Sequence, residues 1–360
     1  MAKTPLYDLH ARSGARFTSI VGWDVAASFG DPKAEYAAVT ESAAILDRSP
    51  MGRFRVSGKD ALDLLNRLSS YKVDVLPEGT GAGTLLTTNK GRVIDVLHLF
   101  VTSGGLLMLT SPGARQRVAE WIDAYTFMEE ASLEDVTEAT AMIGVLGPEA
   151  EAILLKLAGG AFHRLERYGS APLSIGGVEA MALRADPLRS PGYDLVAPAA
   201  KAEALWTALA EAGAVPVGED TFNVLRIEAG IPRHGWEISE DVNPWEAALQ
   251  EYIHFAKGCY IGQEVVLRLN TYQKVQRYPV LLALGHAQVK EGAALEQDGK
   301  PVGAVTSVAV HPLSGEIIGL GIVRTAVASP GAVLQVAAGD AAPASTATVR
   351  RVLGEVPAGV

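Results

Sequence analysis

The feature that most constrains the fold is a change in the pattern of residues after Tyr278. From there to Val360, short runs rich in Val and Leu are separated by Gly, Asp-Gly and Pro, and no long helical period is present. Short apolar runs bounded by such turn residues are typical of β-strands. Residues 278–360 therefore predict a small all-β domain.

The preceding residues mix helices and strands without a regular alternation of the two. Residues 53–58 alternate basic and apolar side chains, as a half-exposed strand does. The apolar residues of 61–68 are spaced i, i+3, i+4 and i+7, which predicts a helix with one buried stripe. Further helices are expected at about 114–127, 148–158, 199–212 and 220–229. A chain of 360 residues is too long for one ordinary core, so the sequence predicts an α+β protein of more than one domain with a β-rich C-terminal module.

A hairpin is predicted from Leu85 to Val101, with its turn at Lys90-Gly91-Arg92. In its second strand Asp95 interrupts a row of Val and Leu side chains on one face. A carboxylate on an apolar face has to be hydrogen-bonded, paired or turned toward a cavity. Two interpretations stay open at this point. The face is partly exposed, or Asp95 is a pocket acid suited to binding a ring nitrogen or to assisting proton transfer.

Charge and cysteine content exclude several classes of function. The net charge of −10 argues against nucleic acid as a main partner, because phosphate binding needs an excess of Lys and Arg. One cysteine excludes an internal disulfide and a metal site built from this chain's thiols. The seven histidines are scattered, so we expect no metal. The sequence contains no apolar run long enough for a membrane span and no secretory signal at its start, so a cytoplasmic protein without a membrane partner is expected.

A second group of candidates begins at Arg226 and Glu228, near the end of a predicted helix that Gly230 closes. Glu237 and Glu246 follow within about twenty residues. Several acids, one arginine and backbone-shaping glycines and prolines are typical of a loop that builds a binding site. The alternative is a solvated helix end with surface salt bridges.

The third candidate is the segment KGCYIGQE, which contains the only cysteine of the chain. Its residues of interest are Lys257, Gly258, Cys259, Tyr260, Gly262, Gln263 and Glu264. The two glycines permit a tight turn or a close approach of the backbone. Free cysteine is usually a small buried side chain, and a reactive thiol is the alternative for Cys259.

Motifs along nearly the whole chain resemble the T-protein (aminomethyltransferase) family. They are TPLYDLHARSGARF, TTNKGRVIDVLHLF, LGPEAEAIL, RIEAGIPRHGWEI, PWEAAL and GAVTSVAVHPLSGEIIGLGIVR. The resemblance implies a three-domain ring that binds tetrahydrofolate, or a one-carbon derivative of it, and ends in a small β-barrel. It implies a two-lobed folate-binding region at 1–277, with a second lobe at approximately 51–138 inserted in the first, and a barrel domain at 278–360.

Within that family, KGCYIGQE resembles the YgfZ-type branch of folate-binding proteins. This resemblance implies a role in the assembly or repair of iron–sulfur clusters, with iron–sulfur proteins as partners and Cys259 as a candidate reactive thiol. The alternative is a tetrahydrofolate-dependent aminomethyltransferase that works with a lipoyl carrier protein, or a related demethylase. A third interpretation is a folate-fold scaffold that binds proteins only.

The resemblance also assigns site residues. It implies that Asp95 is the acid near the reactive folate nitrogen, catalytic if the protein is a transferase. It implies that Asp194, in GYDL, binds the pterin ring, and that Arg226 and Glu228 of the RxExG motif line the folate site. The sequence departs from the transferase pattern at Pro50, Tyr71, Lys72, Gly83 and Val96. These departures favour folate binding without ordinary aminomethyl transfer.

Overall fold

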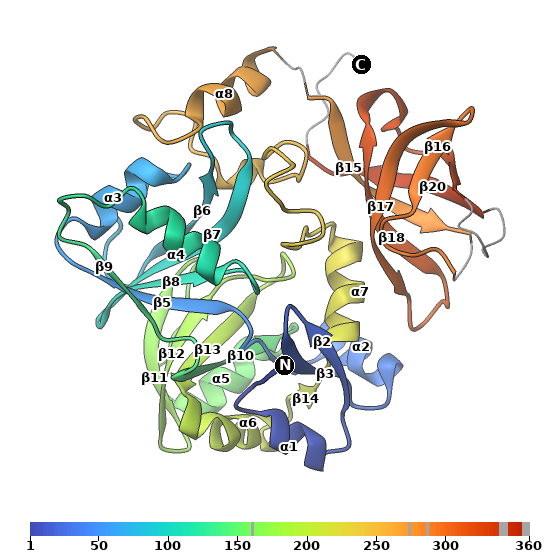
Figure 1. Cartoon of the computed structure of the whole chain (residues 1–360). Helices are drawn as coiled ribbons and strands as arrows, with labels where there is room; N and C mark the ends of the chain where they lie inside the picture. The colour runs from blue at the N-terminus through green and yellow to red at the C-terminus, as the bar shows by residue number, and fades with distance from the viewer. Residues whose placement is uncertain (160–161, 273–274, 286–287, 338–344, 355–360) are drawn as a thin grey trace. The chain divides into compact units, whose positions relative to one another are not determined.

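The computed structural model describes residues 1–159, 162–272, 275–285, 288–337 and 345–354 (Figure 1). The chain forms two compact units. The first comprises Met1–Thr84 and Val96–Phe222, and the second comprises Leu85–Asp95 and Asn223–Val360. No helix among the described residues is long and apolar enough to cross a membrane.

A six-stranded sheet is the largest element of the first unit (Figure 1). Its strands, in spatial order, are β11 (Ser170–Ile175), β12 (Val178–Arg184), β13 (Gly192–Pro198), β10 (Thr140–Leu146), β4 (Ala44–Asp47) and β14 (Val215–Pro216). Helices α5 (Ala150–Ala158) and α6 (Ala202–Glu211) pack on one face, where Leu154 and Leu205 join Tyr193 in one apolar cluster. The antiparallel register of β10 and β13 places Gly144 opposite Asp194 on the other face.

A five-stranded sheet packs against that other face. Its spatial order is β6 (Gly81–Thr87), β7 (Val93–Thr102), β8 (Gly105–Thr110), β5 (Gly52–Ser57) and β9 (Ser132–Asp135). Phe100 of β7 and Leu109 of β8 form one cluster with Met142 of β10 and Leu183 of β12. The first unit is therefore layered, and the polar residues of its candidate site lie between two sheets. The strands β6 and β7 form the predicted hairpin, whose tip belongs to the second unit.

The remaining elements of the first unit are short. They are β1 (Ala2–Lys3), α1 (Tyr7–Arg12), β2 (Arg16–Ile20), β3 (Trp23–Ser28), α2 (Pro32–Glu41), α3 (Ala61–Leu68), α4 (Arg115–Asp123), the 3₁₀ turn η2 (Ala199–Lys201) and the start of α7 (Glu219–Ala229). Helix α3 confirms the stripe predicted from its apolar spacing. Helix α4 ends at Asp123, earlier than predicted, because the amides of Tyr125 and Thr126 bond back three residues and close a turn.

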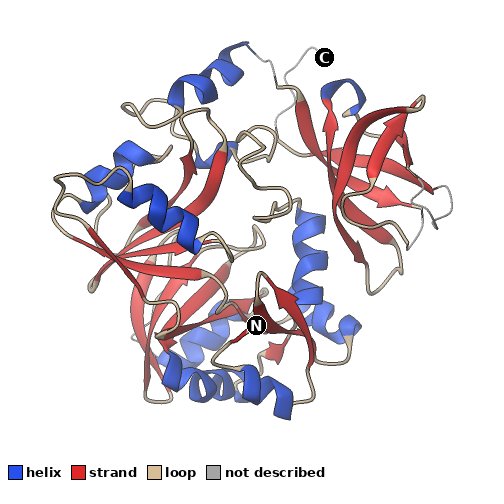
Figure 2. Cartoon of the chain, viewed as in Figure 1, coloured by secondary structure: helices blue, strands red, loops and turns tan. Residues whose placement is uncertain are grey.

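The second unit contains a closed six-stranded barrel. Its strands, in spatial order, are β15 (Arg277–Leu284), β18 (Ile317–Arg324), β17 (Lys300–Val310), β16 (Ala294–Gln297), β19 (Val333–Val336) and β20 (Ser345–Val352). Figure 2 shows these strands with the helical turn η4 (Thr325–Val327) among them. The turn η3 (Gln250–Tyr252) and helix α8 (Gln263–Tyr272) precede the barrel. The α+β class with a C-terminal β-barrel is confirmed, whereas the two-lobed division of 1–277 stays a prediction.

Candidate functional site

Asp194, on β13, is a fully buried carboxylate of the first unit. It lies between Gly144 of β10 and Leu183 of β12. Arg48, directly after β4, places Nε 2.8 Å from Oδ1 of Asp194. Among the described residues, neither oxygen of Asp194 has a hydrogen-bond partner, and only Oδ1 has the ion-pair contact. The ion pair therefore leaves one buried carboxylate oxygen with its hydrogen-bonding capacity unused, which suits an N–H donor of a ligand.

Gly144 makes room for this pair because glycine has no side chain. A Cβ at that position would lie 2.7 Å from Cδ of Arg48 and 3.5 Å from Oδ1 of Asp194. The guanidinium of Arg48 also lies over the ring of Phe222, 5.5 Å from its centroid. The side chain of Arg48 is therefore enclosed on two sides, and it is only 11% exposed.

Burial and the neighbouring guanidinium have opposite effects on the pKa of Asp194. Burial raises the pKa of the Asp194 carboxyl above its ordinary value, and the adjacent Arg48 guanidinium works against that rise. Arg53 acts in the same direction as Arg48, but hydroxyl and carbonyl oxygens surround its own guanidinium. Arg48 is thus the cation in direct contact with the carboxylate.

His98, on β7, is half-buried. Its ring centroid lies 5.8 Å from that of Tyr168. Burial and the positive charges of Arg48 and Arg167 lower the pKa of His98 to about 4. The imidazole is therefore neutral at pH 7, and it adds a polar group without a charge to the region between the two sheets.

Asp95 lies three residues before His98 on the same strand and is fully buried. Strand alternation turns its side chain to the opposite face of β7 from that of His98. The expectation that this face is partly exposed is wrong. Asp95 belongs to the second unit and Asp194 to the first. The catalytic and folate-binding roles of Asp95 stay predictions.

Arg226, on α7, is buried and bonded at each guanidinium nitrogen. Nε donates to Oδ1 of Asn223 at 2.9 Å, and Nη1 donates to Oε2 of Glu237 at 2.9 Å. Nη2 donates to Oγ of Ser307, on β17, at 2.6 Å. The alternative of a solvated helix end with surface salt bridges is therefore wrong for Arg226. These contacts join α7 to the barrel, and folate binding by Arg226 stays a prediction.

Glu228, two residues further along α7, interacts with a loop of the barrel. Its Oε1 lies 3.2 Å from Nε2 of His311. Nδ1 of His311 accepts hydrogen bonds from the amides of Leu313 and Ser314. The proton of a neutral His311 is therefore on Nε2, from which it is directed to Glu228. A folate contact by Glu228 also stays a prediction.

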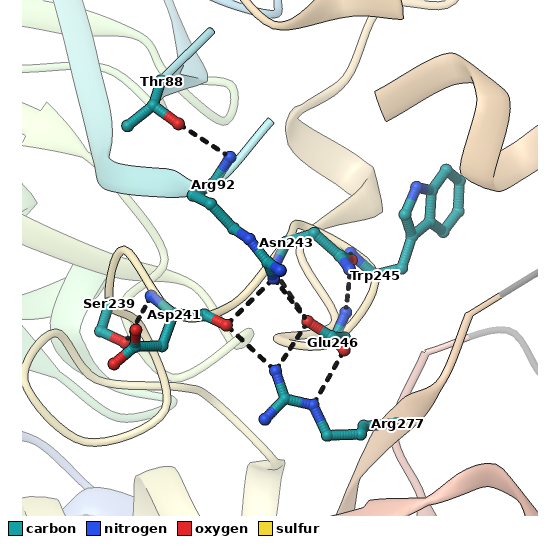
Figure 3. Close-up of polar contacts among 8 residues, drawn as sticks. All are labelled: Thr88, Arg92, Ser239, Asp241, Asn243, Trp245, Glu246 and Arg277. Atoms are coloured by element: carbon teal, nitrogen blue, oxygen red, sulfur yellow. Dashed lines mark hydrogen bonds and ion pairs between the residues drawn. The ribbon is translucent and has the colours of Figure 1, made fainter. Parts of the chain in front are cut away.

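Glu246 is the centre of a third polar cluster (Figure 3). It is buried, and Arg277 donates to both of its oxygens at 2.9 and 3.0 Å. Arg92, at the hairpin tip, donates to Oε2 of Glu246 at 3.3 Å and to the carbonyl oxygen of Asp241 at 3.0 Å. The amide of Asn243 donates to the same Oε2. One buried carboxylate thus holds together the hairpin tip, the loop after α7 and the first barrel strand.

The KGCYIGQE segment has both buried and exposed residues. Lys257 is buried, with Nζ 5.3 Å from the ring centroid of Tyr260. Cys259 is exposed, so the interpretation of this residue as a small buried side chain is wrong. Gln263 donates to the carbonyl oxygen of Gly258 at 3.3 Å and thereby closes the turn. The thiol is accessible to reagents, and its reactivity stays a prediction.

Gly262 lies against the hairpin tip. Its φ is +83°, and a Cβ there would lie 2.4 Å from the carbonyl oxygen of Thr88. Next to it, Oγ1 of Thr87 donates to the carbonyl oxygen of Ile261 at 2.7 Å. Gly258 has no heavy atom within 4 Å of its Cβ position. The two glycines of the motif therefore have different roles, and only Gly262 is required by packing.

Sequence reasoning missed Arg48, Gly144 and His98. His98 could have been found, since it is a polar residue within an apolar strand, as Asp95 is. Nothing local marks Arg48 or Gly144, because their importance comes from strand pairing between distant segments. The described residues contain no group of three His, Cys, Asp or Glu side chains arranged to hold a metal ion.

Two protein families match this chain. The GCVT N-terminal domain matches residues 6–257, and the glycine cleavage T-protein C-terminal barrel domain matches residues 277–351. The second match covers the closed barrel described above.

Two relatives and one solved structure are similar along most of their length. An aminomethyltransferase of Rubrobacter xylanophilus is 29% identical over 90% of this chain and 87% of its own. One of Streptomyces avermitilis is 31% identical over 91% of each chain. The crystal structure of the glycine cleavage system aminomethyltransferase T from Bartonella henselae has a TM-score of 0.86 at 22% identity, covering 97% of this chain and 96% of that one. The last comparison supports the fold alone.

Proposed function

The chain belongs to the family of the GCVT N-terminal domain and the glycine cleavage T-protein C-terminal barrel, and we propose that it is a tetrahydrofolate-dependent one-carbon transferase of the aminomethyltransferase type. The names of its relatives support this proposal over an iron–sulfur role. Tetrahydrofolate, when bound, supplies the nitrogen atoms that accept the one-carbon unit.

Asp194 is the observation that carries the proposal. Its Oδ2 is buried and has no hydrogen-bond donor among the described residues. A buried carboxylate oxygen without a donor is costly, so a ligand that supplies an N–H group gains binding energy there. The pterin ring of tetrahydrofolate carries adjacent N–H donors of this kind. Asp194 would hold that ring, and Asp95 would act near the reacting nitrogen as a proton donor or acceptor.

Asp194→Asn is expected to weaken tetrahydrofolate binding by about tenfold to a hundredfold, because a charge-assisted hydrogen bond contributes about 1.5–3 kcal/mol. Isothermal calorimetry under anaerobic conditions measures the affinity. Asp74→Asn, at an exposed position, is the matched control and should bind as the natural protein does. Equal affinity of the Asp194→Asn and Asp74→Asn variants would show that Asp194 does not bind tetrahydrofolate. No binding by the natural protein would favour a scaffold that contacts only other proteins.

Turnover distinguishes a transferase from a folate-binding protein. Tetrahydrofolate mixed with an aminomethylated lipoyl carrier protein should yield methylenetetrahydrofolate, ammonia and the free dithiol carrier. Asp95→Asn should slow this reaction while the protein still binds tetrahydrofolate. A panel of small methylated substrates tests the related demethylase activity. Folate binding without turnover on any of these would contradict the transferase proposal.

A YgfZ-type role in iron–sulfur cluster assembly or repair is the second candidate. It is supported by the KGCYIGQE segment and by the exposure of Cys259. The test is the activity of iron–sulfur enzymes under oxidative stress in cells from which the gene has been deleted. The natural gene should restore these activities, and the Cys259→Ser gene should restore them less. Unchanged iron–sulfur enzyme activities after the deletion would exclude this role.

Iodoacetamide is expected to alkylate Cys259 fully in the folded protein, because the side chain is exposed. Intact-mass spectrometry should find one added group without denaturant. Cys259→Ser is the negative control and should gain no group, since the chain has no other cysteine. A thiol that reacts only after unfolding would contradict its exposure and weaken the second candidate.

A further inference from the structure

We propose that Arg48 is a positioning residue for Asp194: it keeps the carboxylate ionised and fixes its orientation, so that Oδ2 accepts a hydrogen bond from the ligand. This inference rests on the proposed function, because it concerns the same ligand site. It assigns to Arg48 a role that neither the resemblance nor the comparisons assign.

The backbone around Arg48 fixes where its side chain begins. The amide of Arg48 donates to the carbonyl oxygen of Met142 at 2.9 Å and so continues the pairing of β4 with β10. Gly144 lies two residues further along β10, on the same face. The absence of a Cβ at Gly144 lets the Arg48 side chain cross the strand toward β13. Strand pairing and one glycine thus direct a single arginine onto Asp194.

The orientation of the guanidinium is fixed as well. Nε contacts Oδ1 of Asp194, and Cζ lies over the ring of Phe222, 5.5 Å from its centroid. A planar cation held between a carboxylate and an aromatic ring has few alternative rotamers. Arg48 makes an ion-pair contact with Oδ1 only, and neither oxygen of Asp194 has a hydrogen-bond partner among the described residues. Oδ2 therefore has neither an ion-pair contact nor a hydrogen bond there and is the oxygen that can accept one from a ligand.

Arg48 keeps Asp194 ionised through its positive charge, which a neutral side chain at this position could not do. The charged groups that act on Asp194 are Arg48 and Arg53, and burial opposes both. His98, from the facing sheet, is neutral at pH 7 and contributes no charge. Without Arg48 the buried carboxyl would bind a proton more readily. A protonated Asp194 would turn an O–H group toward ligand N–H donors and would lose affinity for them.

The dependence of tetrahydrofolate affinity on pH tests this role. Calorimetry between pH 5 and pH 8 compares the natural protein with Arg48→Met and Arg48→Lys. Arg48→Met should bind about tenfold more weakly at pH 7, and its affinity should fall at a higher pH than that of the natural protein. Arg48→Lys should restore part of this shift, because it retains the charge. A structural role alone would lower the affinity equally at every pH, and parallel curves would overturn the inference.

A ligand-free measurement separates this inference from the proposed function. Infrared spectra of protein with isotope-labelled aspartate detect a protonated carboxyl group. At pH 7, Arg48→Met should show such a band, and the band should be absent when Asp194→Asn is added. An Asp194 that remains ionised in Arg48→Met would overturn the inference even if tetrahydrofolate binds. If the natural protein binds no tetrahydrofolate, the proposed function fails, and the spectra still decide the role of Arg48.

Gly144→Ala provides a second variant in case Arg48→Met does not fold. The added methyl group would displace the Arg48 side chain without removing its charge from the chain. We expect the same carboxyl band and the same upward shift of the pH at which affinity falls. Circular dichroism identifies the variants that are folded. A folded Gly144→Ala protein with the natural pH profile and no new band would contradict the positioning role.

Discussion

Glu237→Gln should lower the free energy of unfolding by about 3–5 kcal/mol, because it leaves Arg226 buried without a counter-charge. Glu237 and Arg226 are both about 1% exposed. Oε1 of Glu237 accepts hydrogen bonds from the hydroxyl groups of Thr306 and Ser307, each at 2.6 Å. Its Oε2 accepts from Arg226 and from the amide of Arg233. An amide in place of the carboxylate removes the charge and turns an N–H group toward some of these donors.

Urea unfolding measures the loss, and hydrogen exchange of the β17 amides shows that the second unit is affected. Glu264→Gln makes the same chemical change at an exposed position, where we expect less than about 0.5 kcal/mol. Arg226→Met should be about as harmful as Glu237→Gln, and the double variant should lose less than the sum of the two. Strict additivity would mean that the pair does not stabilise the fold as a unit.

Gly262→Ala should destabilise the second unit by about 2–5 kcal/mol, through backbone strain and overpacking together. The positive φ of this residue disfavours any side chain, and the new Cβ would lie 2.4 Å from the carbonyl oxygen of Thr88. The backbone of the hairpin tip has no rotamer with which to avoid that contact. Either the tip or the KGCYIGQE turn has to move.

Gly258→Ala is the matched control from the same segment. Its Cβ would meet no heavy atom within 4 Å, and its φ is outside the left-handed region. We expect a change of less than about 0.5 kcal/mol in the unfolding free energy. Urea unfolding of both variants makes the comparison. A Gly262→Ala protein as stable as Gly258→Ala would show that the turn relaxes around the added methyl group.

Local patterns predicted the local structure well. The apolar spacing of 61–68 gave helix α3, and the turn at Lys90-Gly91-Arg92 gave the hairpin of β6 and β7. The short strands after Tyr278 indicated a β domain, which the structure shows to be a closed barrel. In each case the signal and the structure lie within a few residues of each other.

The pairing of strands that lie far apart in the sequence determines the burial and the contacts that the sequence alone did not predict. Asp95 and Arg226 were each compatible with exposed or buried positions, and only the fold shows that both are buried. Arg48 meets Asp194 because β4 and β13 both pair with β10. No pattern along the chain specifies that arrangement. For Cys259 the sequence left a buried side chain and a reactive thiol open, and only the fold shows that the side chain is exposed.

The hairpin tip, Leu85–Asp95, belongs to a unit whose other residues are translated last, and this affects folding during synthesis. The amide of Val93 donates to the carbonyl oxygen of Val242, and Arg92 binds Glu246. During translation the tip leaves the ribosome well before these partners, so the second unit has to wait for most of the chain. A fragment that begins at Asn223 would lack the tip, so the carbonyl oxygen of Val242 would lose the amide of Val93, and among the described residues Glu246 would keep only Arg277 and the amide of Asn243 as donors. The C-terminal segment Asn223–Val360 therefore needs residues translated much earlier in the same chain to complete its own unit.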